Sequence, residues 1–248
     1  MSLPEVTTRD EWLVARKEHL VREKELTRRR DELNADRRRL PMVQIDKDYV
    51  FDGPDGEASR LDLFAGRHQL IIGHFMFNPA WDEGCSSCSA GADEISVGLL
   101  EHLHVRDTTF VMVSRAPLAK LERYKAQKGW TFPWYSSFDS DFNYDFHVTL
   151  DESRAPVEYN YRSGPEHAAA GTSYYLEGEQ PIEEPGTSFF LQVDGTVFHT
   201  YSVYARGAEM LGGSYAYLDL TALGRQEDWE EPKGRAVTVR SASPDFAS

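Results

Sequence analysis

The pattern of apolar and polar positions predicts an alternation of strands and helices that follows a long charged segment. Continuous apolar runs at residues 68–77 and 108–114 are typical of buried strands. Apolar residues at helical spacing follow each run, over residues 86–103 and 116–128. Because buried strands that alternate with helices form sheets with helices on their faces, this order predicts an α/β sandwich with a mixed, partly parallel central sheet.

Shorter signals complete the predicted body of the protein. Residues 187–193 and 196–201 flank the dipeptide Asp194-Gly195, and this pattern is typical of a β-hairpin. Two short strands, one helical turn and a closing helix are predicted at residues 43–45, 49–51, 61–66 and 210–224.

Residues 9–39 predict one long charged helix, capped by Thr7 or Thr8 and ended by Pro41. Its 11 Arg and Lys against eight acids give a charge of +3, while the rest of the chain carries −17. Its apolar residues form only a narrow stripe, so two interpretations stay open: a solvated helix packed on its own domain, and a dimerisation arm. Nucleic-acid binding by the arginines is less favoured than either interpretation, because acidic residues are interleaved with the arginines.

Length and composition favour one substantial domain with an appendage. We expect a charged arm over residues 1–41, a domain over 42–225 with a polar insertion at 151–184, and an acidic, then Ser-rich, partly disordered tail over 226–248. Neither a membrane span nor a secretory signal is expected, because no 18-residue window is uninterruptedly apolar and the N-terminus is charged. The net charge of −14 argues against nucleic acid and anionic membranes as partners.

The only two cysteines, Cys85 and Cys88, lie where the first buried strand meets the following helix. Unpaired backbone N–H groups and the positive end of the helix dipole favour an anion at such a place. They can lower a thiol pKa from ~8.5 to ~7 or below. We interpret Cys85 as the attacking thiol and Cys88 as the resolving thiol. Nearby Asp82 and Glu83 oppose this, since negative charge raises a thiol pKa.

Several neighbours are candidates for supporting roles. Ser86 and Ser87 are small, leave the thiols accessible and can hydrogen-bond sulfur. Arg115 follows the second buried strand at the carboxyl edge of the sheet, where working groups gather. It either steadies an anionic thiolate or is a solvated loop charge. Trp81 and Thr187 are expected to border the site.

Two other interpretations of the cysteines stay open. Buried cysteines without chemistry are the common alternative, and a metal site is the other. Zinc prefers four ligands, and only two thiols exist. The histidines that would have to complete such a site stand at no recognised ligand spacing; they are His74, His102, His104 and His199. We therefore predict no metal and no cofactor other than the redox-active Cys85–Cys88 disulfide itself.

Residues 129–135 and 138–146 are crowded with aromatic rings. Such density is typical of core packing or a subunit interface, and a substrate-binding surface is the less common alternative. A homodimer would form through this aromatic-rich segment or through the N-terminal arm.

Several stretches resemble a bacterial group known as domain-of-unknown-function family 899, described as thioredoxin-like. They are residues 85–89 (CSSCS), 113–118 (VSRAPL), 129–134 (GWTFPW) with 141–143 (DFN), and 218–225 (LDLTALGR). The resemblance implies a thioredoxin-like three-layer α/β/α sandwich with a mixed central sheet in its peroxiredoxin-like form, over residues 43–224. The long N-terminal helical arm predicted above precedes it.

The chain departs from these relatives at two places. Thioredoxins have a proline, usually cis, before the hairpin strand, whereas Gly186 precedes Thr187 here. Substrate backbone pairing is therefore expected to differ. Peroxiredoxins have a Thr three residues before the peroxide-reacting Cys and a Pro three residues earlier. Pro79 keeps the proline, but Asp82 replaces the Thr, which weakens the case for peroxidase activity.

These observations predict a cytosolic dithiol–disulfide oxidoreductase in which Cys85 attacks and Cys88 resolves. Its partner would be a protein or small-molecule disulfide or thiol, and a reducing cytoplasm would make the Cys85–Cys88 disulfide transient and catalytic. A thiol peroxidase using the same pair and a non-catalytic binding or assembly protein of the same fold are the alternatives.

Overall fold

The computed structural model describes residues 4–211 together with residues 213, 220, 229, 231 and 233. Most of the predicted closing helix and the predicted tail lie outside the described residues. The chain divides into two compact units, of which one contains residues 4–41 and the other residues 42–211.

The first unit contains the predicted long helix, α1 (Arg9–Arg37). Thr8 caps it, because its hydroxyl accepts from the Glu11 N–H at 3.3 Å while its own N–H donates to the Glu11 carboxylate at 3.1 Å. This reciprocal capping box satisfies two backbone donors at the start of the helix. Helix α1 is described in full and has no buried residue. Among the described residues, no helix combines the length and apolar content that a membrane span requires.

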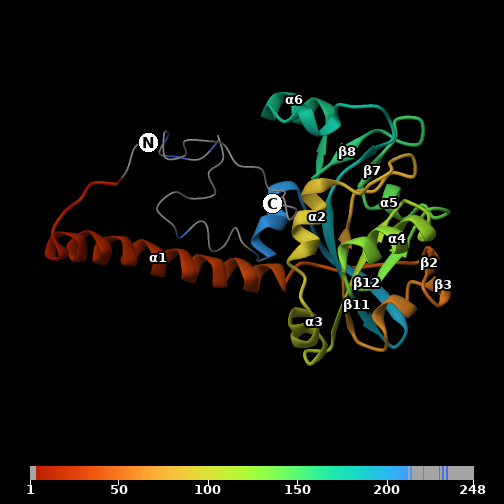
Figure 1. The fold of residues 1–248 in the computed structure, drawn as a ribbon, viewed down its shortest axis with the longest axis horizontal. Helices are drawn as coiled ribbons and strands as arrows, with labels where there is room; N and C mark the ends of the chain where they lie inside the picture. The colour runs from red at the N-terminus through yellow and green to blue at the C-terminus, as the bar shows by residue number, and fades with distance from the viewer. Residues whose placement is uncertain are drawn as a thin grey trace. The chain divides into compact units, whose positions relative to one another are not determined.

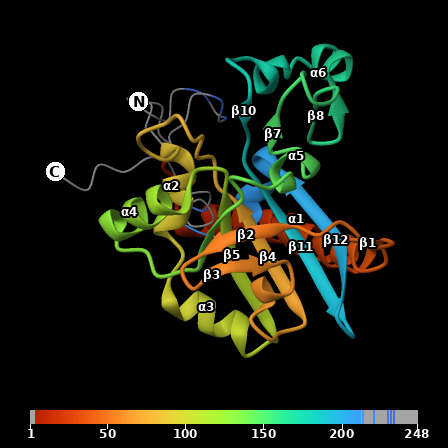
Figure 2. The same cartoon turned by 90° about the vertical axis from the view of Figure 1, so that its right-hand side faces the viewer.

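Within the described residues, the second unit is built on one eight-stranded sheet with the order β1–β12–β11–β4–β5–β6–β2–β3 (Figures 1 and 2). The strands are β1 (Val43–Gln44), β2 (Val50–Gly53), β3 (Gly56–Ser59), β4 (Gln69–His74), β5 (Thr108–Ser114), β6 (Trp134–Ser136), β11 (Gly186–Val193) and β12 (Thr196–Tyr204). Strands β4, β5 and β6 are mutually parallel, and the other neighbours are antiparallel. The predicted mixed sheet is confirmed.

Helices connect the parallel strands. They are α2 (Ser86–Asp93) and α3 (Val97–His104) between β4 and β5, and α4 (Leu118–Lys128) between β5 and β6. The short helices elsewhere are η1 (Asp62–Phe64), α5 (Phe142–Asp145) and η3 (Ala205–Leu211). The core order β5–β4–β11–β12, with two parallel strands followed by an antiparallel hairpin, is the thioredoxin fold.

The prediction of one continuous helix over residues 86–103 was wrong, because this segment forms two helices. The chain leaves α2 after Asp93 and starts α3 at Val97, because the Ser96 hydroxyl accepts from the Leu99 N–H at 3.1 Å and caps a new helix. A local polar cap thus overrides apolar periodicity that continues across the break.

The sheet separates two apolar cores, since successive side chains of a strand point to opposite faces. Val111 and Val113 of β5 belong to one core, and Met112 between them belongs to the other. The second core also contains Phe132 and Trp134, both 0% exposed. The aromatic segment is therefore core packing, the first of the predicted alternatives, and it also supplies strand β6.

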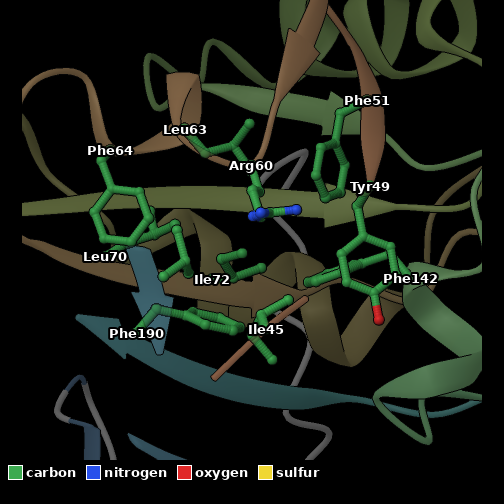
Figure 3. A pocket seen from close by; sticks show the side chains of 11 residues that line it. Ile45, Tyr49, Phe51, Arg60, Leu63, Phe64, Leu70, Ile72, Phe142 and Phe190 are labelled. Atoms are coloured by element: carbon green, nitrogen blue, oxygen red, sulfur yellow. The ribbon is translucent and has the colours of Figure 1, made fainter. Parts of the chain in front are cut away.

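One small pocket lies in the first core, between Phe51, Leu70, Ile72 and Phe190, with Arg60 reaching over it (Figure 3). It encloses only about 10 Å³, which is room for roughly one water molecule. We interpret it as a packing gap, and it contains neither cysteine.

Residues 151–184 carry the small elements β8 (Glu158–Tyr159), β9 (Arg162–Ser163), α6 (Gly164–Ala170), η2 (Ser173–Leu176) and β10 (Ile182–Glu183). Figure 2 shows α6, β8 and β10 together at one end of the large sheet. Strand β10 pairs with β7 (Thr149–Leu150), and the chain then enters β11. This return path brings two glutamates to the carboxyl end of β4.

Candidate functional site

Backbone hydrogen bonds on both sides hold Cys85 at the start of α2. Its N–H donates to the carbonyl of Met76, two residues beyond β4, at 3.0 Å. Its carbonyl accepts from the backbone N–H and the hydroxyl of Ser89, both at 2.9 Å. Cys85 is therefore the N-cap residue of α2. The strand–helix junction predicted from the sequence is present.

The loop that carries Cys85 is anchored to α4. The Lys120 ammonium donates to the carbonyls of Pro79, at 2.8 Å, and Trp81, at 2.5 Å. The Trp81 side chain is 37% exposed. An apolar ring thus lies on the surface four residues before Cys85.

Glycine is required at position 84 by its close approach to buried rings. A Cβ atom there would lie 2.6 Å from Cε1 of Phe75 and 3.1 Å from Cε1 of Tyr124. Rings in a packed core move aside only at a cost of about 1–3 kcal/mol. Gly84 therefore allows the loop to pass directly over the rings of the second core, one residue before Cys85.

The two thiols are free and have opposite pKa shifts. A hydrogen bond from Cys88 lowers the pKa of Cys85 to about 6, and the backbone N–H groups of Cys88 and Ser87 add to this effect against the opposing effect of burial. The same hydrogen bond, burial and the charge of Cys85 raise the pKa of Cys88 well above its ordinary value. Near neutral pH, Cys85 therefore carries the negative charge and Cys88 carries the proton.

The serines between the cysteines, Ser86 and Ser87, are both exposed. They form the first turn of α2, so their backbone N–H groups are among those that a helix leaves unpaired at its start. The Ser87 N–H is one of the groups that lower the pKa of Cys85.

Gly186 and Thr187 begin β11 and are both buried. They pair with His74 and Gly73 of β4, at the strand end from which the Cys85 loop departs. A Cβ atom on Gly186 would lie only 2.7 Å from Cδ1 of Tyr204. This contact gives a physical reason for the missing proline, because a ring at this position would overlap Tyr204.

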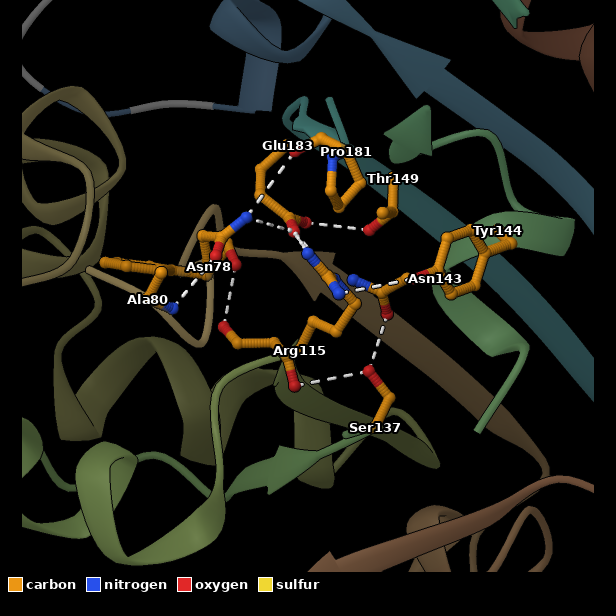
Figure 4. Close-up of polar contacts among 11 residues, drawn as sticks. Asn78, Ala80, Arg115, Ser137, Asn143, Tyr144, Thr149, Pro181 and Glu183 are labelled. Carbon is orange, nitrogen blue, oxygen red and sulfur yellow. Dashed lines mark hydrogen bonds and ion pairs between the residues drawn. The ribbon is translucent and has the colours of Figure 1, made fainter. Parts of the chain in front are cut away.

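Arg115 lies at the carboxyl end of β5, as predicted, but it pairs with Glu183 and not with a cysteine thiolate (Figure 4). Its Nε and Nη2 atoms contact Oε1 of Glu183 at 2.7 and 2.6 Å, and Nη1 donates to the Tyr144 hydroxyl at 3.2 Å. The Thr149 hydroxyl donates to the other carboxylate oxygen of Glu183 at 2.7 Å. The Arg115 side chain is only 12% exposed, so it is not a solvated loop charge.

This buried ion pair also contacts the loop that precedes Cys85. The Asn78 amide lies 3.4 Å from Oε1 of Glu183 and 3.5 Å from the carbonyl of Pro181 (Figure 4). Arg115 and Glu183 therefore fasten the return path of residues 181–183 to the loop that carries Cys85.

Glu184 is a site residue that sequence reasoning missed. Burial raises its pKa to about 7, a hydrogen bond from Tyr159 opposes that shift, and the negative charge of Cys85 adds to it. Its N–H donates to the carbonyl of Val148 at 2.9 Å, which fixes its backbone. The available signal is the pair of adjacent acids, Glu183 and Glu184, shortly before the predicted strand at residues 187–193.

The histidines considered as metal ligands lie elsewhere. His74 Nε2 lies 2.8 Å from the Ser188 hydroxyl. The Ser188 hydroxyl lies 2.7 Å from the Ser202 hydroxyl, which in turn lies 2.7 Å from His199 Nε2. Burial lowers the pKa of His74 to about 3, so its ring is neutral. Within the described residues, no group of three or more His, Cys, Asp or Glu side chains is arranged to hold a metal ion.

Comparison with known proteins identifies the family. A family model described as "bacterial protein of unknown function (DUF899)" matches residues 1–242. The chain belongs to this family. In this DUF899 protein the matched span contains both cysteines, the Arg115–Glu183 ion pair and Glu184. A search of curated proteins finds no match.

Several solved structures are similar to this DUF899 chain. A cysteine-to-serine mutant of Xylella fastidiosa PrxQ is 13% identical with a TM-score of 0.40, covering 66% of this chain and 84% of that one. The bacterioferritin comigratory protein of Xanthomonas campestris is 17% identical with a TM-score of 0.40, covering 65% and 86%. Peroxidoxin BcpB of Mycobacterium tuberculosis is 11% identical with a TM-score of 0.39, covering 68% and 91%.

Proposed function

We propose that this protein is a dithiol–disulfide oxidoreductase that uses Cys85 and Cys88. One observation carries the proposal: Cys85 is the N-cap residue of α2, and there the Cys88 side chain and the backbone N–H groups of Ser87 and Cys88 lower its pKa to about 6. A thiolate that forms below neutral pH is the reactive species in thiol–disulfide exchange.

The reaction balances with the two thiols alone. The Cys85 thiolate attacks a substrate disulfide, forms a mixed disulfide and releases one substrate thiolate, which takes up a proton. Cys88 then loses its proton and attacks Cys85, so that the Cys85–Cys88 disulfide forms and the second substrate thiolate leaves. The substrate gains two electrons and the protein loses two. A reducing cytoplasm would restore the dithiol.

The neighbouring residues have corresponding roles in this proposal. The exposed Trp81 ring provides apolar contact for a substrate, and Ser86 and Ser87 leave the sulfur open to attack. Gly186 and Thr187 form the strand end beside the loop, and Arg115 acts through Glu183 as a positioning residue. The substrate is a protein or small-molecule disulfide.

Turnover assays with three substrates separate this function from its alternatives. The reduced protein is expected to reduce insulin or a model disulfide in the presence of a thiol donor. Consumption of hydrogen peroxide at a higher rate than disulfide would instead identify a thiol peroxidase. Inactivity in both assays would overturn the proposal in favour of a non-catalytic binding protein.

The pH dependence of alkylation tests the charge on Cys85 directly. Because only the thiolate reacts, the rate with iodoacetamide should rise with pH through the pKa of about 6 and level off above it. At pH 7, about nine-tenths of Cys85 would be ionised. Cys88 should stay unreacted over this range, because its pKa is raised. Peptide mapping distinguishes the two sites, and half-maximal labelling of Cys85 only above about 8.5 would contradict the charge assignment.

We also propose that α1 is a dimerisation arm. Its apolar side chains lie open, with Trp12 45% and Leu26 68% exposed. Its charge of +3 complements the −17 of the remaining chain, so a second copy offers a matching surface. Light scattering should give twice the mass of one chain at low salt. R28E/R29E/R30E should give single chains, whereas a wild-type monomer at every concentration would contradict the proposal.

A further inference from the structure

We propose that Ser89 and Tyr124 are positioning residues of the cysteine pair: a chain of two buried hydroxyl groups joins helix α4 to the backbone of Cys85 and holds that residue in place for attack and ring closure. The inference rests on the proposed function. It assigns a role to the last residue of the CSSCS stretch, which the attacking and resolving thiols do not explain.

The hydrogen bonds of this chain have one direction, toward Cys85. The Ser89 hydroxyl donates to the Cys85 carbonyl at 2.9 Å. Since a serine hydroxyl has only one hydrogen, it accepts in its second contact, which is with the Tyr124 hydroxyl at 3.0 Å. Tyr124 therefore donates to Ser89, and Ser89 donates to Cys85. Each bond in such a chain polarises the next, so the two bonds strengthen one another.

Both hydroxyl groups lie beside the second apolar core, where an unpaired polar group destabilises the fold. Ser89 is 4% exposed and Tyr124 is 6% exposed. Each hydroxyl is satisfied by the other and, in the case of Ser89, by the Cys85 carbonyl. This arrangement exists only when α2 starts directly after Cys85, so the hydroxyl pair favours this start of the helix over a shifted one.

The packing of α4 fixes the Tyr124 hydroxyl. The centroid of the Tyr124 ring lies 5.5 Å from that of Phe77 and 5.7 Å from that of Trp130. Lys120, one turn earlier on the same face of α4, holds two carbonyls of the loop before Cys85. One face of α4 therefore fastens both the loop that leads to Cys85 and the helix that follows it.

The Cys85 carbonyl matters because it orients the first turn of α2 around the sulfur. It accepts from the backbone N–H of Ser89 as well as from the hydroxyl, both at 2.9 Å, so two donors hold its peptide plane. In this geometry the N–H groups of the second and third helical residues, Ser87 and Cys88, face the side chain of the N-cap residue. Cys88 is also the resolving thiol, so a fixed first turn reduces the reorganisation that ring closure requires.

The experiment measures ring closure and the charge on Cys85 in the same variants. The reduced protein is mixed with dithiobis-nitrobenzoate, which releases one chromophore when Cys85 attacks and a second when Cys88 closes the ring. Ser89→Ala should slow the second release about fivefold, the factor that corresponds to one hydrogen bond. It should also move the pH profile of Cys85 alkylation to higher pH, because the N–H groups that stabilise the thiolate are then less well oriented.

Tyr124→Phe keeps the buried ring and removes only the first hydroxyl of the chain. It should slow the second release by a smaller factor of about two, since Ser89 still reaches Cys85 but in a less fixed orientation. In the double variant of Ser89→Ala with Tyr124→Phe, the second release should be no slower than in Ser89→Ala alone, because Tyr124 acts only through Ser89.

Tyr135→Phe is the matched control. It removes a tyrosine hydroxyl from the other face of the sheet, where Tyr135 packs against the first core, and should leave both releases and the pH profile unchanged.

The wild-type second release and pH profile in Ser89→Ala would overturn the positioning role. A further loss when Tyr124→Phe is added to Ser89→Ala would also overturn the proposal, because Tyr124 would then act by another route. Absence of the second release in the wild type would overturn the dithiol function. The pH profile of alkylation would still decide whether the two hydroxyl groups position Cys85, so the two failures are distinguishable.

Discussion

Cys85→Ser is expected to lower disulfide reduction by roughly 10⁴-fold or more, because the variant has no thiolate nucleophile. Cys88→Ser and Cys88→Ala should instead let the first step proceed and accumulate a mixed disulfide on Cys85, since the resolving thiol is missing. Mass spectrometry of the protein after brief exposure to a model disulfide would detect the adduct.

The two Cys88 variants also separate the resolving role from the electrostatic role. The hydrogen bond from Cys88 is the largest cause of the lowered pKa of Cys85. Serine keeps a hydroxyl donor at this position, whereas alanine removes the donor. The pKa of Cys85 should therefore rise above about 7 in Cys88→Ala and rise less in Cys88→Ser, as measured by thiolate absorbance against pH. An unchanged pKa in Cys88→Ala would show that the helix N-terminus alone holds the charge.

Arg115→Met is expected to lower the free energy of unfolding by about 3–5 kcal/mol, because it leaves the Glu183 carboxylate buried without its partner. The Glu183 side chain is only 1% exposed, and burial already raises its pKa despite the attraction of Arg115. Urea unfolding monitored by tryptophan fluorescence measures the loss.

Two further variants test whether the missing charge partner is the cause. The double variant Arg115→Met with Glu183→Leu should recover most of the lost stability, since both charges are then gone. Arg39→Gln breaks the ion pair with Asp36, whose two side chains are both 72% exposed, and should change the free energy of unfolding by less than about 1 kcal/mol. A loss of similar size in Arg39→Gln, or no recovery in the double variant, would contradict the assignment.

The ion pair also links stability to the site. Because Asn78 contacts Glu183, loss of the pair frees the loop that carries Cys85. The pKa of Cys85 should then move toward the ordinary value of a thiol in any Arg115 variant that remains folded. This effect is the expected signature of a positioning role.

The sequence alone determined those features that depend on neighbours along the chain. The start of the long helix after Thr8, one of two predicted caps, the strand Thr108–Ser114 and the hairpin around Asp194-Gly195 were all predicted where they occur. The position of Cys85 at a strand–helix junction was predictable for the same reason, because apolar runs, caps and turns act over a few residues.

Only the tertiary structure decided the charge environment of the cysteines. Arg115 and Glu183 are separated by 68 residues, and the charge of Cys85 raises the pKa of Glu184 from a different segment of the chain. The partner of Arg115 therefore depended on how β10 and β11 return to the end of β4. A pKa is set by burial and by charges nearby in space, and neither can be known until distant segments are packed together.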